Sequence, residues 1–200
     1  KNLKQKGLID STITIGNAFG GDYECINIYT GLITAKEIAK ADVVFVSMGP
    51  GIAGTGTKYG FTGIEQGQIL DAIKKLGGNP VAIPRISFAD KRYRHQGISH
   101  HSITVFDKIV NVDVNIPITI YEDKKLNKIK EQIKENKLDE KHNIIFVENN
   151  KCKEDLEYFG LKVKSMGRNY DEDSEFFDSA SSAAYYLMEV CNDWERKYCK

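Results

Sequence analysis

The stretch TGIEQGQILDAIKKLGGNPVAIPRI, residues 62–86, predicts a helix that is followed directly by a strand. Thr62 and Glu65 match the S/T-x-x-E capping box of a helix start, and apolar residues then recur at helical spacing until a Gly-Gly pair. Residues 80–86 favour a strand, although Pro84 places its far end at a sheet edge or in a loop. A helix and a strand in direct succession are typical of an α/β protein.

Two further strands and a helix are predicted before this stretch. Residues 11–15 (STITI) form a β-branched run, and Asp22 can cap a helix over residues 22–39. That helix would turn four large apolar residues inward, namely Ile26, Tyr29, Ile33 and Ile38. Residues 43–46 (VVFV) are apolar without alternation, which is the pattern of a strand covered on both faces in a parallel sheet.

The second half of the chain continues the alternation of strands and helices. The pattern predicts strands within residues 110–120, 144–147 and 161–163, and helices over residues 122–138, 154–159 and 175–198. The last helix carries a stripe that predicts core packing or a dimer seam: Phe177, Ala180, Ala184, Leu187, Cys191, Trp194 and Tyr198. We therefore expect a single α/β domain over residues 1–200, a Rossmann-like three-layer sandwich with a mainly parallel sheet.

Composition excludes several classes of protein. Of the 200 residues, 41% are hydrophobic and 28% are charged, and no uncharged apolar run is long enough to span a membrane. The 28 basic and 28 acidic residues leave no net positive charge to attract nucleic acid. The four cysteines form no C-x-x-C pair, which favours a cytoplasmic protein over a disulfide framework or a zinc site.

A glycine-rich stretch, residues 48–63 (MGPGIAGTGTKYGFTG), is the first candidate for ligand binding. Glycine lets backbone N–H groups approach a phosphate or carboxylate, and a helix N-terminus adds a favourable dipole. The residues predicted to contact such a ligand are Gly49, Gly51, Gly54, Gly56 and Thr57. The stretch differs from a dinucleotide fingerprint, since Arg85 ends the next strand, and from a P-loop, since Thr57 precedes Lys58. A mobile loop or a close-packed turn is the alternative interpretation.

The second candidate is residues 84–101 (PRISFADKRYRHQGISHH), which contain three of the chain's five arginines and three of its four histidines. Because lysine is the usual basic residue elsewhere in the chain, we predict that Arg85 and Arg94 bind an anion. The candidate general acids or bases are the three histidines, His95, His100 and His101. Asp90 and the three histidines are acceptable metal ligands, but their spacing matches no metal motif, so a metal site is a less favoured alternative and no metal ligand is assigned. The alternative is a surface loop that Asp90 holds in local ion pairs.

The third candidate is residues 17–24 (NAFGGDYE). Asp22 is most simply a helix cap, and a ligand contact is its alternative role. Asn17 directly follows a predicted strand, where α/β proteins often place a polar ligand contact. Because ligands bind outside the carboxyl ends of the strands in such sheets, we expect the three candidate loops to converge on one site.

Four motifs carry a resemblance to a known family: GNAFGGDYE, MGPGIAGTGTKYGFTGIEQG, PRISFAD and RHQGISHH. Between Gly7 and about Val105 the chain resembles the later half of an uncharacterised bacterial protein family, described only as a domain of unknown function. Members of that family are longer, so the resemblance and the abrupt start at Lys1 imply a fragment of a longer protein. The resemblance also implies bacterial origin and a cytoplasmic location, and it carries over no catalytic residue.

Taken together, the three loops favour a small-molecule enzyme, a transferase or a hydrolase, that holds a phosphorylated or carboxylated ligand. A nucleotide or metabolite sensor without catalysis is the first alternative, and a homo-oligomer interface formed by the same loops is the second. The sequence identifies no cofactor, and neither nucleic acid nor a membrane is an expected partner.

Overall fold

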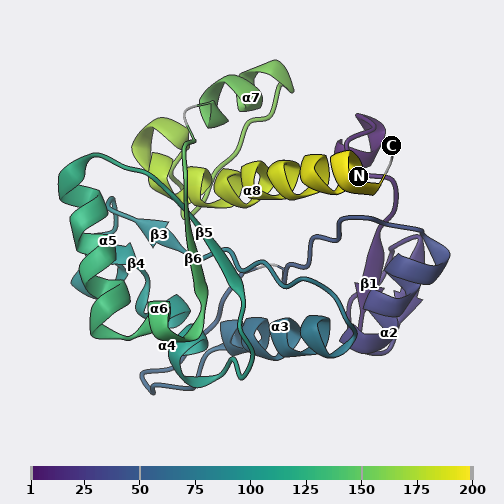
Figure 1. Cartoon of the computed structure of the whole chain (residues 1–200), viewed down its shortest axis with the longest axis horizontal. Helices are drawn as coiled ribbons and strands as arrows, with labels where there is room; N and C mark the ends of the chain where they lie inside the picture. Colours follow the sequence, from purple (N-terminus) through teal and green to yellow (C-terminus); the bar gives the residue numbers. More distant parts are fainter. Residues whose placement is uncertain (1, 50, 150, 199–200) are drawn as a thin grey trace.

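A parallel pair of strands, β5 (Asn115–Thr119) and β6 (Asn143–Val147), lies at the centre of the protein (Figure 1). The structure is a computed structural model that describes residues 2–49, 51–149 and 151–198. The two strands pair in register from Asn115 opposite Asn143 to Thr119 opposite Val147. Helices α5 (Asp123–Glu135) and α6 (Leu138–Lys141) connect them, as a parallel connection requires.

The two faces of β5 differ in chemistry. Thr119 faces helix α8 (Ser174–Tyr198), because its hydroxyl donates to the carbonyl of Asp178 at 3.1 Å and contacts the Ser182 hydroxyl. Successive side chains of a strand alternate, so Ile116 and Ile118 point to the opposite face, where both are buried in the apolar core cluster. Helices α3 (Glu65–Lys75), α4 (His100–Lys108) and α5 contribute the other side of this core.

A short antiparallel pair, β3 (Ile86–Ser87) and β4 (Gly97–Ile98), lies beside α5 (Figure 1). The segment between the two strands contains one 3-10 turn, η3 (Tyr93–His95). Helix α4 begins directly after β4, where the Ser99 hydroxyl accepts from the N–H of His101 and caps the helix. Residues 84–101, the second candidate of the sequence, therefore enter the packed centre of the protein.

The helix predicted after residue 62 is confirmed as α3, which follows a 3-10 turn, η2 (Thr62–Ile64). The capping box does not form, because the Thr62 hydroxyl bonds to the backbone N–H and carbonyl of Ala53 instead. The strand predicted over residues 80–86 is mostly absent. Val81 makes an isolated parallel bridge to Asn115, and only the last of these residues, Ile86, belongs to a strand.

The N-terminal region differs from the prediction. Strands β1 (Ile13–Ile15) and β2 (Tyr23–Cys25) form a separate parallel pair, preceded by α1 (Asn2–Gln5). Helix α2 (Ile28–Ile33) begins late because Asn27 caps it, and a π-helical turn, η1 (Thr34–Ile38), continues it. The four apolar residues that the longer helix would have buried are exposed instead: Ile26, Tyr29, Ile33 and Ile38.

Residues 43–46 form no strand, and Phe45 among them is 68% exposed. No strand in the described part of the chain pairs β1 with the central strands, and the described residues form three separate two-stranded sheets, of which two are parallel. The chain is thus a mixed helix and strand protein, and the Rossmann-like three-layer sandwich is not confirmed. An apolar run alone predicts burial, but pairing partners on both sides are needed to make it a central strand.

The C-terminal segment contains α7 (Cys152–Tyr158), a 3-10 turn η4 (Tyr170–Glu172) and the long helix α8, while residues 161–163 form no strand. Helix α8 packs through small residues, with Ser179, Ser182 and Ala183 buried. The Ser179 hydroxyl donates to the carbonyl of Pro84 at 2.6 Å. The predicted apolar stripe is not this buried face, since Ala180 and Cys191 are exposed; its last two members, Trp194 and Tyr198, have side chains outside the described part. No helix in the described part of the chain is both long and apolar enough for a membrane span.

Candidate functional site

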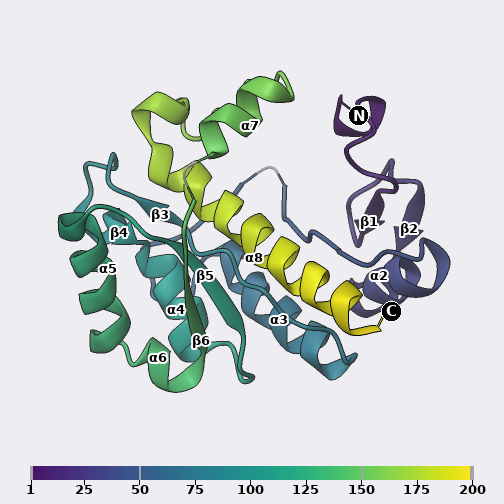
Figure 2. The ribbon, with the colours of Figure 1, turned by 45° about the horizontal axis from the view of Figure 1, so that its top comes forward.

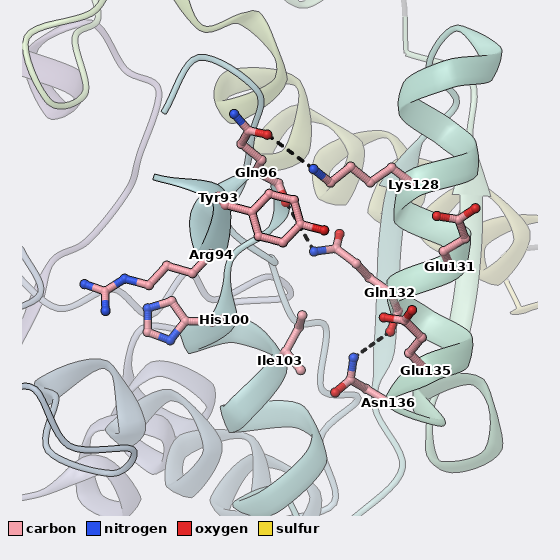
Figure 3. Close-up of a pocket in the computed structure, with 10 residues that line it drawn as sticks. All are labelled: Tyr93, Arg94, Gln96, His100, Ile103, Lys128, Glu131, Gln132, Glu135 and Asn136. Carbon is pink, nitrogen blue, oxygen red and sulfur yellow. Dashed lines mark hydrogen bonds between the residues drawn. The ribbon is translucent and has the colours of Figure 1, made fainter. Parts of the chain in front are cut away.

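A pocket of about 190 Å³ lies between η3 and the start of α4 on one side and α5 on the other (Figure 3). We call it the η3–α5 pocket. It is lined by Tyr93, Arg94, Gln96, His100, Ile103, Lys128, Glu131, Gln132, Glu135 and Asn136. Arg94 and His100 were predicted from the sequence as ligand-binding and catalytic residues, and they line the same pocket. Helix α5 was predicted from the sequence as a helix over residues 122–138, and no part in a site was assigned to it.

The α5 side of the pocket is a polar stripe on the helix. Lys128, Glu131, Gln132, Glu135 and Asn136 follow one another at steps of three, one, three and one, so they share a helix face. The next face carries isoleucines that are buried in the core, which fixes the rotation of the helix. This stripe of glutamate and amide residues within a lysine-rich helix was the sequence signal that could have located the second wall.

The Gln132 side chain joins the two walls of the pocket. It forms hydrogen bonds with backbone groups at β4, as the backbone of a neighbouring strand would. Its Oε1 accepts from the N–H of Ile98 at 2.8 Å, and its Nε2 donates to the carbonyls of Ile98 at 3.1 Å and Gln96 at 3.2 Å. Gly97 makes this approach possible, because it has φ +75° and a Cβ there would lie 2.3 Å from Oε1 of Gln132. The two walls of the pocket are thus held together by hydrogen bonds between the Gln132 side chain and backbone groups of the η3 side.

Arg94 extends from η3 with its guanidinium beside the imidazole of His100 (Figure 3). The Arg94 side chain is exposed and makes no ion pair with any carboxylate in the described ranges. Burial, followed by the neighbouring His101 and Arg94, lowers the pKa of His100 to about 4. The Nε2 atom of His100 is buried and has no hydrogen-bond partner within the described protein.

The three histidines form one cluster. The ring centroids of His100 and His101 lie 4.0 Å apart, and those of His95 and His100 lie 4.8 Å apart. Burial, with Arg92 and Arg85 next, lowers the pKa of His95 to about 4, and burial also lowers the pKa of His101. The cluster is therefore neutral near pH 7. No three His, Cys, Asp or Glu side chains of the described residues are placed to hold a metal ion.

Arg85 lies in a different environment from Arg94. Its Nη2 is 3.6 Å from a carboxylate oxygen of the buried Asp90, which also binds the guanidinium fork of Arg92 at 3.1 and 2.9 Å. The hydrogen bonds from Arg92 hold the pKa of Asp90 far below its usual value. The local ion pairs considered as an alternative for this segment are thus present at Arg85 and Arg92, whereas Arg94 remains outside them.

The glycine-rich loop lies apart from the pocket. Gly54 bridges to Phe61, and the N–H of Thr55 donates to the carbonyl of Gly60, so the loop folds back on itself. The five residues predicted to contact a ligand there are exposed and do not line the η3–α5 pocket: Gly49, Gly51, Gly54, Gly56 and Thr57. The loop reaches the histidine cluster at its end, where the ring centroids of Phe61 and His101 stack 4.3 Å apart.

Asn17 and Asp22 also lie away from the Arg and His residues. Asn17 lines a second, more open pocket of about 350 Å³ at β1 and β2, and Figures 1 and 2 place these strands at the opposite end of the molecule from β4. Asp22 accepts from the N–H of Thr12 at 2.8 Å and pairs with Lys4, and these hydrogen bonds, that of Lys4 first, lower its pKa to about 2. The three loops therefore do not converge, because no strand over residues 43–46 brings β1 beside the central sheet.

The fold and site define a mixed α and β protein with a small polar pocket beside a histidine cluster. The chain belongs to the family described as "protein of unknown function (DUF3866)", whose model matches residues 1–184. The match covers nearly the whole chain, and it is therefore wider than the resemblance between Gly7 and Val105. No significant match was found among curated proteins or among solved structures. Bacterial origin, cytoplasmic location and membership of a longer protein stay predictions.

Proposed function

We propose that the chain binds a small molecule bearing a carboxylate or phosphate group in the η3–α5 pocket, as a transferase or hydrolase. The observation that supports the proposal is Arg94, a residue of the pocket lining whose guanidinium lies beside His100 without a carboxylate partner in the described ranges. A guanidinium offers a planar fork of donors that suits both anions. Arg85 is not assigned to the ligand, because Asp90 already pairs with it.

The size of the pocket restricts the ligand. Pockets for drug-sized molecules measure roughly 300–1,000 Å³, whereas the η3–α5 pocket holds about 190 Å³. This favours a small metabolite over a nucleotide or a dinucleotide cofactor. The loops at residues 17–24 and 48–63 take no part in the proposed binding.

His100 is the residue proposed to transfer a proton, because it is the only one of the three histidines that lines this pocket. Its pKa of about 4 leaves it neutral near pH 7. An anion bound to Arg94 would stabilise the protonated imidazole and neutralise the guanidinium that disfavours it, so it would raise the pKa of His100 toward the pH at which acid–base catalysis operates. His95 and His101 pack against His100 and hold it in place.

The metabolite sensor remains the second candidate function, and the lowered pKa of His100 favours it. A base with a pKa of about 4 is a weak proton acceptor near neutral pH unless its ligand raises that pKa. The two candidates differ in one result. An enzyme turns its ligand over with a pH profile that His100→Gln abolishes, while a sensor binds and releases the ligand unchanged.

The test of the shared binding step is Arg94→Gln, with pentanoate and inorganic phosphate as probes and calorimetry as the readout. We expect Arg94→Gln to weaken binding roughly tenfold or more, because hydrogen bonds to charged groups contribute about 1.5–3 kcal/mol. The free energy of unfolding should change by no more than about 0.5 kcal/mol, since the side chain is exposed.

The matched control is Lys134→Gln, which removes one positive charge from an exposed position of α5 outside the pocket. It should leave the affinity for both probes unchanged. In addition, the pKa of His100, followed by NMR, should rise when the probe is added to the wild type. Equal affinity of the wild type and Arg94→Gln would refute the binding site.

A further inference from the structure

Residues 43–46 (VVFV) combine an apolar sequence with exposed side chains. Phe45 is 68% exposed, and Val43 and Val44 are 38% and 44% exposed. The backbone groups of the segment form no hydrogen bond with other backbone groups in the described part of the chain, and Figure 2 shows the segment within the coil between α2 and α3. Its side chains and its backbone are therefore both open to pairing with another strand.

The composition of the segment favours a β-strand. Valine and phenylalanine are enriched in strands, and residues 43–49 (VVFVSMG) contain no charged side chain. A strand with unpaired backbone groups is a template for pairing with a further chain, and proteins commonly protect such strands with lysine or proline. Residues 43–49 contain neither, so the sequence does not protect the segment against pairing.

The charges around the segment favour a second copy of this chain as its partner. In an antiparallel pairing about a two-fold axis, Val44 of each copy lies opposite Phe45 of the other, and such aromatic and β-branched pairs stabilise a sheet. Asp42 of each copy lies opposite Ser47 of the other, so no like charges meet. A strand of a different protein would be selected by complementary charge, and residues 43–49 offer no charge for that selection.

We propose that residues 43–46 form an antiparallel strand pair with the same residues of a second copy of this chain, at the centre of a weak homodimer interface. The pairing gives the segment a neighbouring strand and covers one Phe45 and one Val44 on each face of the pair. Ile38 and Ile52, on either side of the segment in the chain, are 61% and 51% exposed and add apolar surface there. Residues 43–46 do not line the η3–α5 pocket, so this inference does not depend on the proposed function.

A pairing of this size predicts weak association. Interfaces that bury less than about 1,200 Å² in total belong to transient complexes, so we expect a dissociation constant in the micromolar range. In more dilute solution the chain is a monomer with Phe45 exposed. Substitutions of Phe45 should therefore affect association far more than they affect folding.

Sedimentation equilibrium of the whole chain, from about 5 µM to about 1 mM, measures the association. Phe45→Glu should weaken it at least tenfold, because it places a carboxylate against Val44 of the other copy. Val44→Lys should weaken it similarly, because it places an ammonium group against Phe45. The matched control is Phe19→Glu, which replaces an aromatic ring that is 77% exposed and outside the segment, and it should leave the association unchanged.

A mixture of the two charged variants tests the antiparallel arrangement. The ammonium group introduced by Val44→Lys then faces the carboxylate introduced by Phe45→Glu, while the second pair remains Val44 opposite Phe45. The mixture should therefore form a heterodimer at concentrations at which each variant alone is a monomer. A wild type that is monomeric throughout the range, or a dimer that Phe45→Glu leaves unchanged, would overturn the proposal. Loss of association in both variants without recovery in the mixture would also overturn it.

Discussion

Two regions of this chain use similar apolar residues in opposite ways. The buried apolar cluster is formed by residues between Phe61 and Leu138, and Phe106 and Ile118 within it are completely buried. In the described residues before Phe61 the large apolar side chains are mostly exposed, with Ile26 at 86% and Phe45 at 68%. The sequence predicted candidate ligand-binding loops in both regions. The η3–α5 pocket, which Arg94 lines, lies in the packed region.

This difference shows what a functional site requires of its scaffold. The η3–α5 pocket is held in place because Gln132 bonds to the backbone of β4 while isoleucines of its own helix are buried in the core. The glycine-rich loop bonds to itself, and its contact with the packed region is made at Phe61. A site on rigid elements keeps its geometry without the ligand, whereas a loop must be ordered by the ligand.

The sharpest way to test the comparison is to remove one phenylalanine from each region. Phe106→Ala should lower the free energy of unfolding by about 3–5 kcal/mol, because it opens a cavity in the core. Phe45→Ala should change it by about 0.5 kcal/mol or less, since that ring is exposed. Urea unfolding followed by circular dichroism measures both. Similar losses in the two variants would mean that residues 43–46 are buried, as the sequence pattern predicts.

A smaller effect concerns the pH dependence of stability, which the histidine cluster confers on the packed region. His95 and His100 have pKa values of about 4 when folded and near 6.5 when unfolded. The unfolded chain therefore binds more protons between these values, so their stabilising contribution is complete above pH 6.5 and is lost as the pH falls toward 4. We expect a loss on the order of 1–3 kcal/mol between about pH 7.5 and about pH 5.

The variant that checks this origin is His95→Gln. It keeps a polar side chain beside Ser99, which His95 contacts at 3.2 Å, but it removes one titrating group. Urea unfolding at the two pH values should then show a shallower dependence than the wild type, even if the variant is less stable at both. Asp22 and Asp90 have lowered pKa values, so their contributions to stability are lost only at a pH below this range. They therefore do not affect the comparison between about pH 7.5 and about pH 5. If the pH dependence of the unfolding free energy were unchanged in this variant, His95 would not be one of its sources.

The sequence predicts local structure better than it predicts how the elements assemble. The amphipathic pattern located α3, α5 and α8, and the apolar run at residues 144–147 located β6. Residues 43–46 have the same apolar character as β6 but find no neighbouring strand, and strand pairing is a long-range property that no local pattern contains. Helix α2 starts later than the sequence predicted because Asn27, and not Asp22, is its N-cap residue.

For the candidate site, composition located one wall and missed the other. The concentration of arginine and histidine in residues 84–101 drew attention to Arg94 and His100, which do share a pocket. Helix α5 supplies the second wall from more than 25 residues further along the chain, and residues 84–101 themselves do not say which helix will pack against them. Convergence of the three loops was inferred from a sheet order that the structure does not have.

The most direct test of the account is to map the site by NMR while pentanoate is added to the ¹⁵N-labelled protein. We predict that the largest shifts of amide signals occur at Arg94, His100 and Gln132, on the two walls of the η3–α5 pocket. Signals of residues 17–24 and 51–57 should stay in place. Shifts confined to those N-terminal loops, with Arg94 and Gln132 unaffected, would contradict the central claim that the packed region holds the site.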